Sequence, residues 1–138
     1  MSRIVKCAHI QASNAKHDGT PAEIKEAMIK KHIPLIEEAG KKGVQILCLQ
    51  EIFHGPYFCA EQDIKWYGTA EKVPGPMVER LAEYAKKYQM VMVIPVYEME
   101  IAGVYYNTAA VVDADGTYLG KFRKIHIPHT WPGFWEKF

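Results

Sequence analysis

Two segments with helical periodicity, each opened by a proline, set the strongest limit on how this chain can fold. The first begins with TPAE at residues 20–23, a capping-box pattern with proline at the first helical position. Apolar residues then recur at helical spacing until Gly40 and Gly43, and Pro34 is expected to kink or loosen this helix. The second segment follows PGP at residues 74–76, and its apolar stripe consists of Val78, Leu81, Ala82 and Ala85. Two amphipathic helices are therefore expected, and each must bury its stripe against another layer.

Strand-like segments surround the two helices. Residues 4–12 and 44–50 flank the first helix, and residues 90–97 follow the second. The segment 90–97 is apolar nearly throughout and is therefore expected to be buried on both faces. Residues 104–112 and 117–127, joined by the turn sequence DADG, predict a β-hairpin. The order β-α-β-α-β-β-β favours an α/β fold in which helices cover one face of a mixed sheet.

Composition and charge argue against several classes of function for this protein. The chain has 138 residues, of which 49% are hydrophobic and 24% charged, as expected for one soluble domain with an apolar core. The net charge is +1 and no basic tract occurs, which argues against binding to nucleic acid or to an anionic membrane surface. The apolar run at residues 90–97 is too short to span a membrane, and the first residues lack a signal-peptide core. Three cysteines without paired spacing favour a reducing, cytoplasmic setting.

A carboxylate ends the second predicted strand. The segment ILCLQEIFHGPYFC places Glu51 directly after a run of apolar residues and shortly before a Gly-Pro turn. A carboxylate left buried and unpaired there would be strongly destabilising. Polar groups at the carboxyl ends of strands in α/β proteins face the crevice where ligands usually bind. Glu51 is therefore a candidate functional residue, with hydrogen bonds to the backbone of its own turn as the structural alternative.

A lysine in the last predicted strand is the second candidate. The segment KFRKIHIP alternates so that Phe122, Lys124 and His126 share one face. A lysine beside an aromatic residue near a strand end is either functional or a surface residue whose aliphatic stem covers apolar area. The pattern alone leaves both interpretations of Lys124 open.

Three histidines, at positions 54, 126 and 129, raise the question of a metal site. Such a site would combine imidazoles with carboxylates. His126 and His129 are separated by Pro128 on a strand-to-loop passage, which does not place both rings on one face. Structural or loop-anchoring roles are therefore favoured for the histidines, and no metal is expected.

The cysteines do not suggest a nucleophile. Cys7 and Cys48 lie within strand patterns and are expected to be core residues, which leaves Cys59 as the one that could be exposed. None of the three lies at a helix N-terminus or in another setting that activates a thiol.

Three blocks of sequence together resemble the nitrilase superfamily of carbon–nitrogen hydrolases. They are LCLQEIFHGPYF, GVYYNTAAVVDADGTYLGKFRKIHIP and PGFWEKF, and they run in order over essentially the whole chain. The resemblance is closest to the branch of β-ureidopropionases and N-carbamoyl-amine amidohydrolases. It implies a four-layer α-β-β-α sandwich, of which residues 1–138 would form the N-terminal half as a single incomplete domain.

The same resemblance implies a catalytic set of Glu, Lys and Cys. Glu51 falls on the general base, in the context QEIF, and Lys124 falls on the catalytic lysine, in the context RKIHIP. Glu136, in the context WEKF, matches a second glutamate that supports the site. The implied reaction is hydrolysis of a non-peptide C–N bond in an N-carbamoyl (ureido) acid or amine, without a cofactor.

The implied nucleophile is a cysteine well beyond the lysine, whereas all three cysteines of this sequence precede Lys124. The nucleophile and the second half of the sandwich are therefore expected to follow residue 138, and the chain alone is expected to be inactive. One hypothesis is a part of a Cys-dependent amidohydrolase that acts on a small ureido or amide substrate. The other is a catalytically inactive half-domain that acts as a binding or assembly partner. A homo-oligomer, or pairing with the missing half, is expected.

Overall fold

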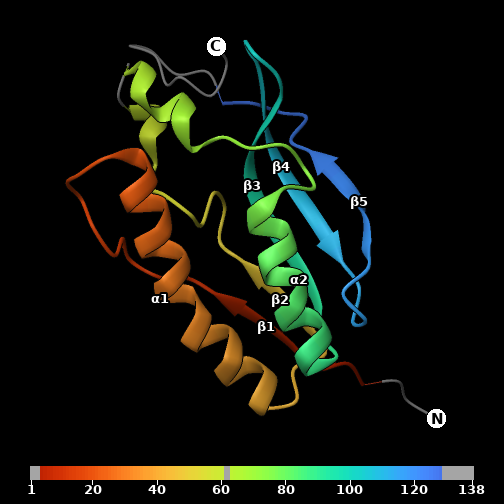
Figure 1. Ribbon diagram of the computed structural model, residues 1–138. Helices are drawn as coiled ribbons and strands as arrows, with labels where there is room; N and C mark the ends of the chain where they lie inside the picture. The colour runs from red at the N-terminus through yellow and green to blue at the C-terminus, as the bar shows by residue number, and fades with distance from the viewer. Residues whose placement is uncertain (1–3, 61–62, 129–138) are drawn as a thin grey trace.

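The strands form one mixed sheet. The computed structural model describes residues 4–60 and 63–128. Its elements are β1 (Cys7–Ile10), α1 (Pro21–Lys41), β2 (Ile46–Leu49), η1 (Phe58–Ala60), η2 (Ile64–Thr69), α2 (Pro76–Tyr88), β3 (Val91–Ile101), β4 (Val104–Val112) and β5 (Tyr118–Arg123). The five strands pair in the order β1-β2-β3-β4-β5 (Figure 1). The pairs β1–β2 and β2–β3 are parallel and the other two are antiparallel, so the predicted element order and mixed sheet are confirmed.

The first helix begins as its sequence predicts. The Thr20 side chain accepts a hydrogen bond from the Glu23 backbone N–H at 3.3 Å, and the Glu23 carboxylate accepts one from the Thr20 N–H at 2.8 Å. This reciprocal capping box satisfies donors that the helix itself leaves unpaired. Pro34 lies inside α1, and the helix continues past it to Lys41. The proline therefore does not end the helix.

Gly40 has a packing role that the sequence analysis missed. It lies inside α1, and the helix ends only where Gly43 adopts a φ of +70°. A Cβ at Gly40 would overlap the ring of Tyr88 at the end of α2. Glycine is thus required at this position because the two helices approach each other closely there.

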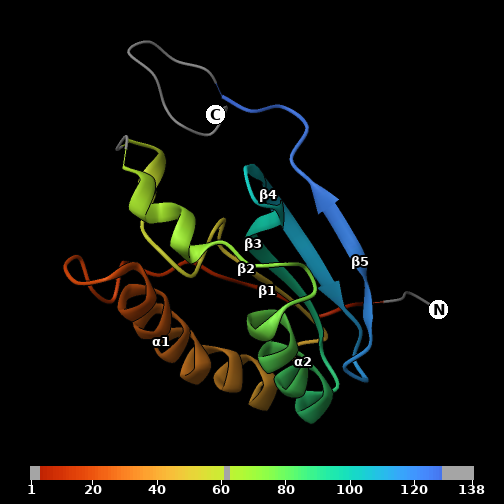
Figure 2. The same cartoon turned by 45° about the horizontal axis from the view of Figure 1, so that its top comes forward.

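Both helices lie on the same face of the sheet (Figure 2). The main core forms between them and the strands, and its fully buried members include Ile36, Leu47, Leu81, Met92 and Ile94. Burial of these side chains supplies the main driving force for folding. The predicted placement of the helices on one face is confirmed. No helix within residues 4–60 and 63–128 is long and apolar enough to cross a membrane.

The opposite face of the sheet, here called the open face, carries apolar residues that are exposed or only partly buried. In the strand register it comprises Cys7, His9, Ile46, Cys48, Val91, Val93, Pro95, Ala109, Val111 and Phe122. Ile46 is 37% and Phe122 is 62% exposed. The expectation that residues 90–97 are buried on both faces is therefore wrong, because the two helices pack on one side only.

Two predictions about cysteine burial are also wrong. Cys7 is exposed because it lies on the open face, whereas Cys59 is only 2% exposed. Cys59 belongs to a second apolar cluster that also contains Ile24, Ile52, Phe58, Trp66 and Tyr97. The short 3₁₀ helices η1 and η2 contribute Phe58, Cys59 and Trp66 to this cluster, and no signal for them was recognised in the sequence.

Strand boundaries differ most at the end of the hairpin. The strand β4 has the predicted bounds, whereas β5 ends at Arg123 rather than near residue 127. The first strand is likewise shorter than residues 4–12, and β3 extends beyond residue 97 to Ile101. Lys124 therefore lies at the first position after β5.

Candidate active site

Glu51 lies just beyond the end of β2, in the turn that leads away from the sheet. The next residue, Ile52, has a φ of +45°, a conformation that a β-branched residue rarely adopts and that stores strain. Ile52 is nonetheless buried in the second apolar cluster, which holds the turn in this shape. The packing of Ile52 thus fixes the backbone immediately after Glu51, while the Glu51 side chain is 53% exposed.

Lys124 contacts Glu51 directly. Its Nζ lies 2.7 Å from Glu51 Oε1, although the two residues are 73 positions apart in the sequence. The structure therefore brings together the two residues that the resemblance assigns to catalysis. The Glu51 carboxylate accepts hydrogen bonds from a side chain of β4 and from Lys124 just after β5, and the Lys124 ammonium is held in an ion pair.

Asn107 is a third member of the site, and the sequence analysis did not identify it. Its Nδ2 donates to Glu51 Oε1 at 2.6 Å. Its backbone carbonyl also accepts a hydrogen bond from the Lys124 N–H at 2.8 Å. The available signal was an amide inside the largely apolar and aromatic strand VYYNTAAVV, where an unpaired polar group would be costly.

These contacts keep the Glu51 carboxylate ionised. The hydrogen bond from Lys124 lowers the pKa of Glu51; partial burial opposes this effect, and the hydrogen bond from Asn107 lowers the pKa further. At neutral pH the site is therefore a carboxylate paired with an ammonium. A carboxylate of this kind can accept a proton, and the ammonium can stabilise a developing oxyanion.

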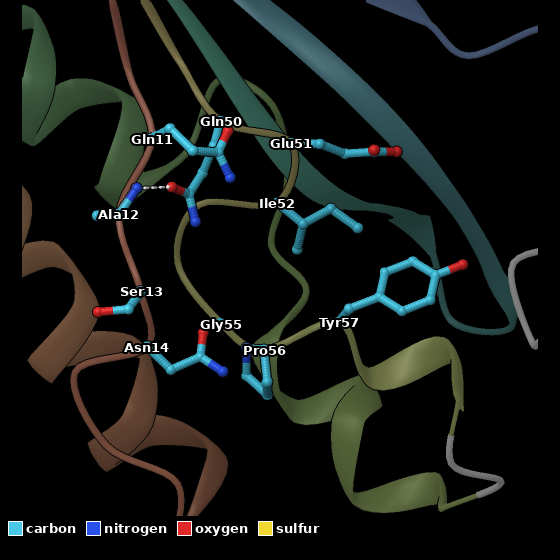
Figure 3. A pocket seen from close by; sticks show the side chains of 10 residues that line it. All are labelled: Gln11, Ala12, Ser13, Asn14, Gln50, Glu51, Ile52, Gly55, Pro56 and Tyr57. Carbon is cyan, nitrogen blue, oxygen red and sulfur yellow. Dashed lines mark hydrogen bonds between the residues drawn. The ribbon is translucent and has the colours of Figure 1, made fainter.

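A pocket of about 460 Å³ adjoins Glu51 (Figure 3). It is lined by residues of two stretches, 11–14 after β1 and 50–57 after β2, so it lies at the carboxyl ends of two neighbouring parallel strands. The amide of Gln50 accepts a hydrogen bond from the Ala12 N–H and ties the two stretches together. Gln11, Asn14 and Gln50 supply neutral polar groups to its wall. The volume suits a small polar molecule.

A buried carboxylate anchors the strand that precedes Lys124. Glu98 on β3 is 1% exposed and accepts hydrogen bonds from Arg123 at 2.7 and 3.0 Å, from Thr108 at 2.6 Å and from Lys121. Burial acts to raise the pKa of Glu98, but these hydrogen bonds outweigh it and lower the pKa to about 2. The guanidinium of Arg123 also stacks over the Tyr106 ring at 3.7 Å. The end of β5 is thereby fixed to β3 and β4.

Stacked aromatic rings join η1 and η2 to the sheet. Tyr97 of β3 and Tyr105 of β4 are diagonal neighbours across the strand pair, and their ring centroids lie 5.4 Å apart. Tyr67 of η2 stacks on Tyr105 at 4.7 Å, and Phe58 of η1 packs on Tyr97 at 4.9 Å. The rings fix the segments that follow the Glu51 turn, at the end of the sheet where Asn107 lies.

Two other predicted site residues cannot be placed relative to Glu51 and Lys124. Glu136 and His129 lie outside the described residues. Within residues 4–60 and 63–128, no group of three or more His, Cys, Asp or Glu side chains is arranged to hold a metal ion. His54 is fully buried against Phe53, and burial followed by the nearby charge of Lys25 lowers the pKa of its imidazole to about 3.

Comparison with known proteins gives a consistent set of relatives. The sequence profile described as "Carbon-nitrogen hydrolase" matches residues 6–138. The chain is 43% identical over 105 residues to an N-carbamoylputrescine amidase of Oryza sativa subsp. japonica, covering 75% of this chain and 34% of that protein. It is 39% identical over 129 residues to a β-ureidopropionase of Arabidopsis thaliana, covering 91% of this chain and 32% of that protein. The chain thus spans about a third of the length of these curated relatives.

The fold has a counterpart among solved structures. A carbon-nitrogen hydrolase from Helicobacter pylori G27 superposes with a TM-score of 0.79 at 27% sequence identity. The matched region covers 96% of this chain and 42% of that chain. The arrangement of sheet and helices described above is therefore a nitrilase-like α/β architecture.

Proposed function

Because the chain belongs to the carbon–nitrogen hydrolase family, we propose that it supplies the general base and the catalytic lysine of an amidohydrolase. The bond cleaved is a non-peptide C–N bond in an N-carbamoyl (ureido) acid or amine. The observation that carries the proposal is the 2.7 Å contact between Lys124 Nζ and Glu51 Oε1. It joins two strand ends and pairs a base with an oxyanion-stabilising cation.

The proposed nucleophile is a cysteine encoded after residue 138. Glu51 takes the proton of this thiol, and the thiolate sulfur attacks the carbonyl carbon. The ammonium of Lys124 stabilises the oxyanion of the tetrahedral intermediate. The C–N bond then breaks, and the leaving amine takes the proton from Glu51. Glu51 next accepts a proton from water, and the water oxygen attacks the carbonyl carbon of the thioester-like intermediate. The C–S bond then breaks, the carboxylic or carbamic acid leaves, and the proton on Glu51 returns to the sulfur to restore the thiol.

The names of the relatives guide the choice of substrate class. N-carbamoylputrescine and a ureidopropionate both contain a ureido group, a carbonyl carbon bonded to two nitrogen atoms, and both appear in the names of proteins that this chain resembles. We therefore place the ureido carbonyl at Glu51 and Lys124. The neutral amide groups of the adjoining pocket provide hydrogen bonds for a small polar substrate. Because the three cysteines show no paired spacing, the protein is proposed to act in the cytoplasm, and the family resemblance favours a homo-oligomer.

A second candidate function rests on the open face. Its apolar residues, with Phe122 62% exposed, form a surface that another protein layer can cover. In this alternative, the 138 residues are the natural product and act as a noncatalytic binding or assembly partner.

One series of measurements separates the two candidates. The first is the intact mass of the polypeptide produced from the native gene, compared with 15.7 kDa for this chain. The second is hydrolysis of N-carbamoylputrescine and N-carbamoyl-β-alanine by that polypeptide, with and without a cysteine-blocking reagent. A larger mass with thiol-sensitive hydrolysis supports the amidohydrolase. A mass near 15.7 kDa without hydrolysis supports the assembly partner.

A further inference from the structure

We propose that Asn107 is the positioning residue of the site, whose side-chain amide orients Glu51 while its backbone carbonyl fixes Lys124. The inference rests on the proposed function and extends it to a residue that contacts both members of the pair. In this role Asn107 orients the Glu51 carboxylate and does not itself exchange a proton.

The position of Asn107 in the sheet explains why one residue can do both. Thr108 pairs with Arg123 in the antiparallel register of β4 and β5, so position 107 faces position 124. The hydrogen bond from the Lys124 N–H to the Asn107 carbonyl, 2.8 Å long, extends this ladder by one residue beyond β5. The Asn107 side chain reaches past β3 to Glu51, which follows β2 and is 56 positions away in the sequence. The amide therefore ties the turn after β2 to the end of β5.

The hydrogen bonds select one oxygen of the carboxylate. Both donors that the structure describes, Asn107 Nδ2 at 2.6 Å and Lys124 Nζ at 2.7 Å, reach Glu51 Oε1. Among the described residues, Oε2 is thus the oxygen left to accept a proton from a thiol or from water. Without Asn107, the carboxylate can rotate about its last side-chain bond while keeping the ion pair. Such a rotation misaligns the proton-accepting oxygen while the ion pair with Lys124 stays intact.

An amide suits this role better than the other side chains of similar size. It is neutral, it does not titrate near neutral pH, and its N–H stabilises the ionised form of the carboxylate. An aspartate at this position would instead place a second negative charge beside Glu51. A leucine would match the shape but leave Glu51 Oε1 with one donor fewer. These two replacements therefore test the donor itself.

The decisive experiment measures the protonation of Glu51 without reference to turnover. Carbon-13 NMR of the side-chain carboxyl, in the polypeptide encoded by the native gene, gives the pKa of Glu51 in the unmodified protein and in Asn107→Leu and Asn107→Asp. Both variants are expected to raise that pKa. Val111→Thr, on the same face of β4 but away from Glu51, is the matched control and is expected to leave it unchanged. An unaltered pKa in a folded Leu or Asp variant overturns the proposal.

Kinetics then test positioning. Asn107→Leu is expected to lower kcat on the order of 10²-fold with little change in KM, and to move the acid limb of the kcat/KM profile to higher pH. Asn107→Gln, which keeps the amide, is expected to recover part of kcat. If the NMR shifts appear but kcat is unchanged, the positioning role is wrong. If the unmodified protein hydrolyses no C–N bond, the proposed function fails, and the titration still decides whether Asn107 controls Glu51.

Discussion

Arg123 and Lys124 are neighbours in sequence, yet their side chains leave the sheet on opposite faces and reach different carboxylates. Arg123 donates to buried Glu98, and Lys124 donates to Glu51 beside the open face. The alternation of side chains along an extended backbone produces this division. The end of β5 is therefore anchored on one side by a buried ion pair and presents the candidate catalytic lysine on the other.

Removing the buried carboxylate should strongly destabilise the protein. Glu98→Ala leaves the charges of Arg123 and Lys121 without their shared partner, and the expected loss is on the order of 3 kcal/mol of unfolding free energy. Urea denaturation of the two proteins measures it. Glu100→Ala is the matched control, because Glu100 pairs with the same Arg123 at 3.0 Å from an exposed position. Its expected cost is much smaller because an exposed ion pair contributes little, and equal losses in the two variants would contradict the role given to Glu98.

The same carboxylate should make stability depend on acid. The pKa of Glu98 is about 2 in the folded protein, below its ordinary value of 4.5. Its contribution is therefore complete above pH 4.5 and is lost as the pH falls from 4.5 towards 2. The free energy of unfolding of the unmodified protein should decrease more steeply across this interval than that of Glu98→Gln. Parallel curves for the two proteins would show that Glu98 does not carry this dependence.

Glu51 and Lys124 should be essential for turnover but not for folding. Glu51→Gln removes the base and is expected to lower kcat by ~10²- to 10⁴-fold. Lys124→Ala removes the oxyanion-stabilising charge, with an expected loss of ~10²- to 10³-fold. Steady-state kinetics and circular dichroism of the encoded polypeptide measure the two properties separately. Lys87→Ala, which breaks a surface ion pair with Glu37, is the control and should retain full activity. Full activity in either site variant would refute the catalytic assignment.

Neither Cys7 nor Cys48 should act as the nucleophile. Cys7 pairs with Ile46 at the start of β1 and β2, whereas Glu51 follows the other end of β2. Burial raises the pKa of the Cys48 thiol, which disfavours the thiolate. Cys7→Ser and Cys48→Ser should therefore keep most of the hydrolytic activity, and a cysteine-blocking reagent should still abolish it in both. Loss of turnover in a folded Cys48→Ser protein would place the nucleophile within this chain.

Local signals predicted most of the fold. The capping box at residues 20–23 and the turn DADG specify their elements through nearby hydrogen bonds, and both elements are found where the sequence indicates. The family resemblance is confirmed by the profile match over residues 6–138. Burial was predicted less well, because Cys7 and Val93 differ from core residues only in which face of the sheet they occupy. That property depends on where the helices pack.

The site itself required the three-dimensional structure. The resemblance pointed to Glu51 and Lys124, but their contact closes over 73 positions and depends on the register of three strand pairs, β2 to β5. Asn107 gave no recognised motif, since its importance comes from facing position 124 across the ladder. The catalytic roles remain predictions that the variants above test.

On the open face, the solvent exposure of a side chain does not by itself predict whether its substitution is tolerated. Ile46 and Phe122 are exposed in this structure, so polar replacement at these positions should leave the sheet and its two helices intact. If a second protein layer lies over them in the working molecule, the same replacements will reduce activity or assembly as strongly as core substitutions do. A systematic substitution profile of the strands, scored for function in the cell, would therefore reveal which of these surface positions are in fact interior.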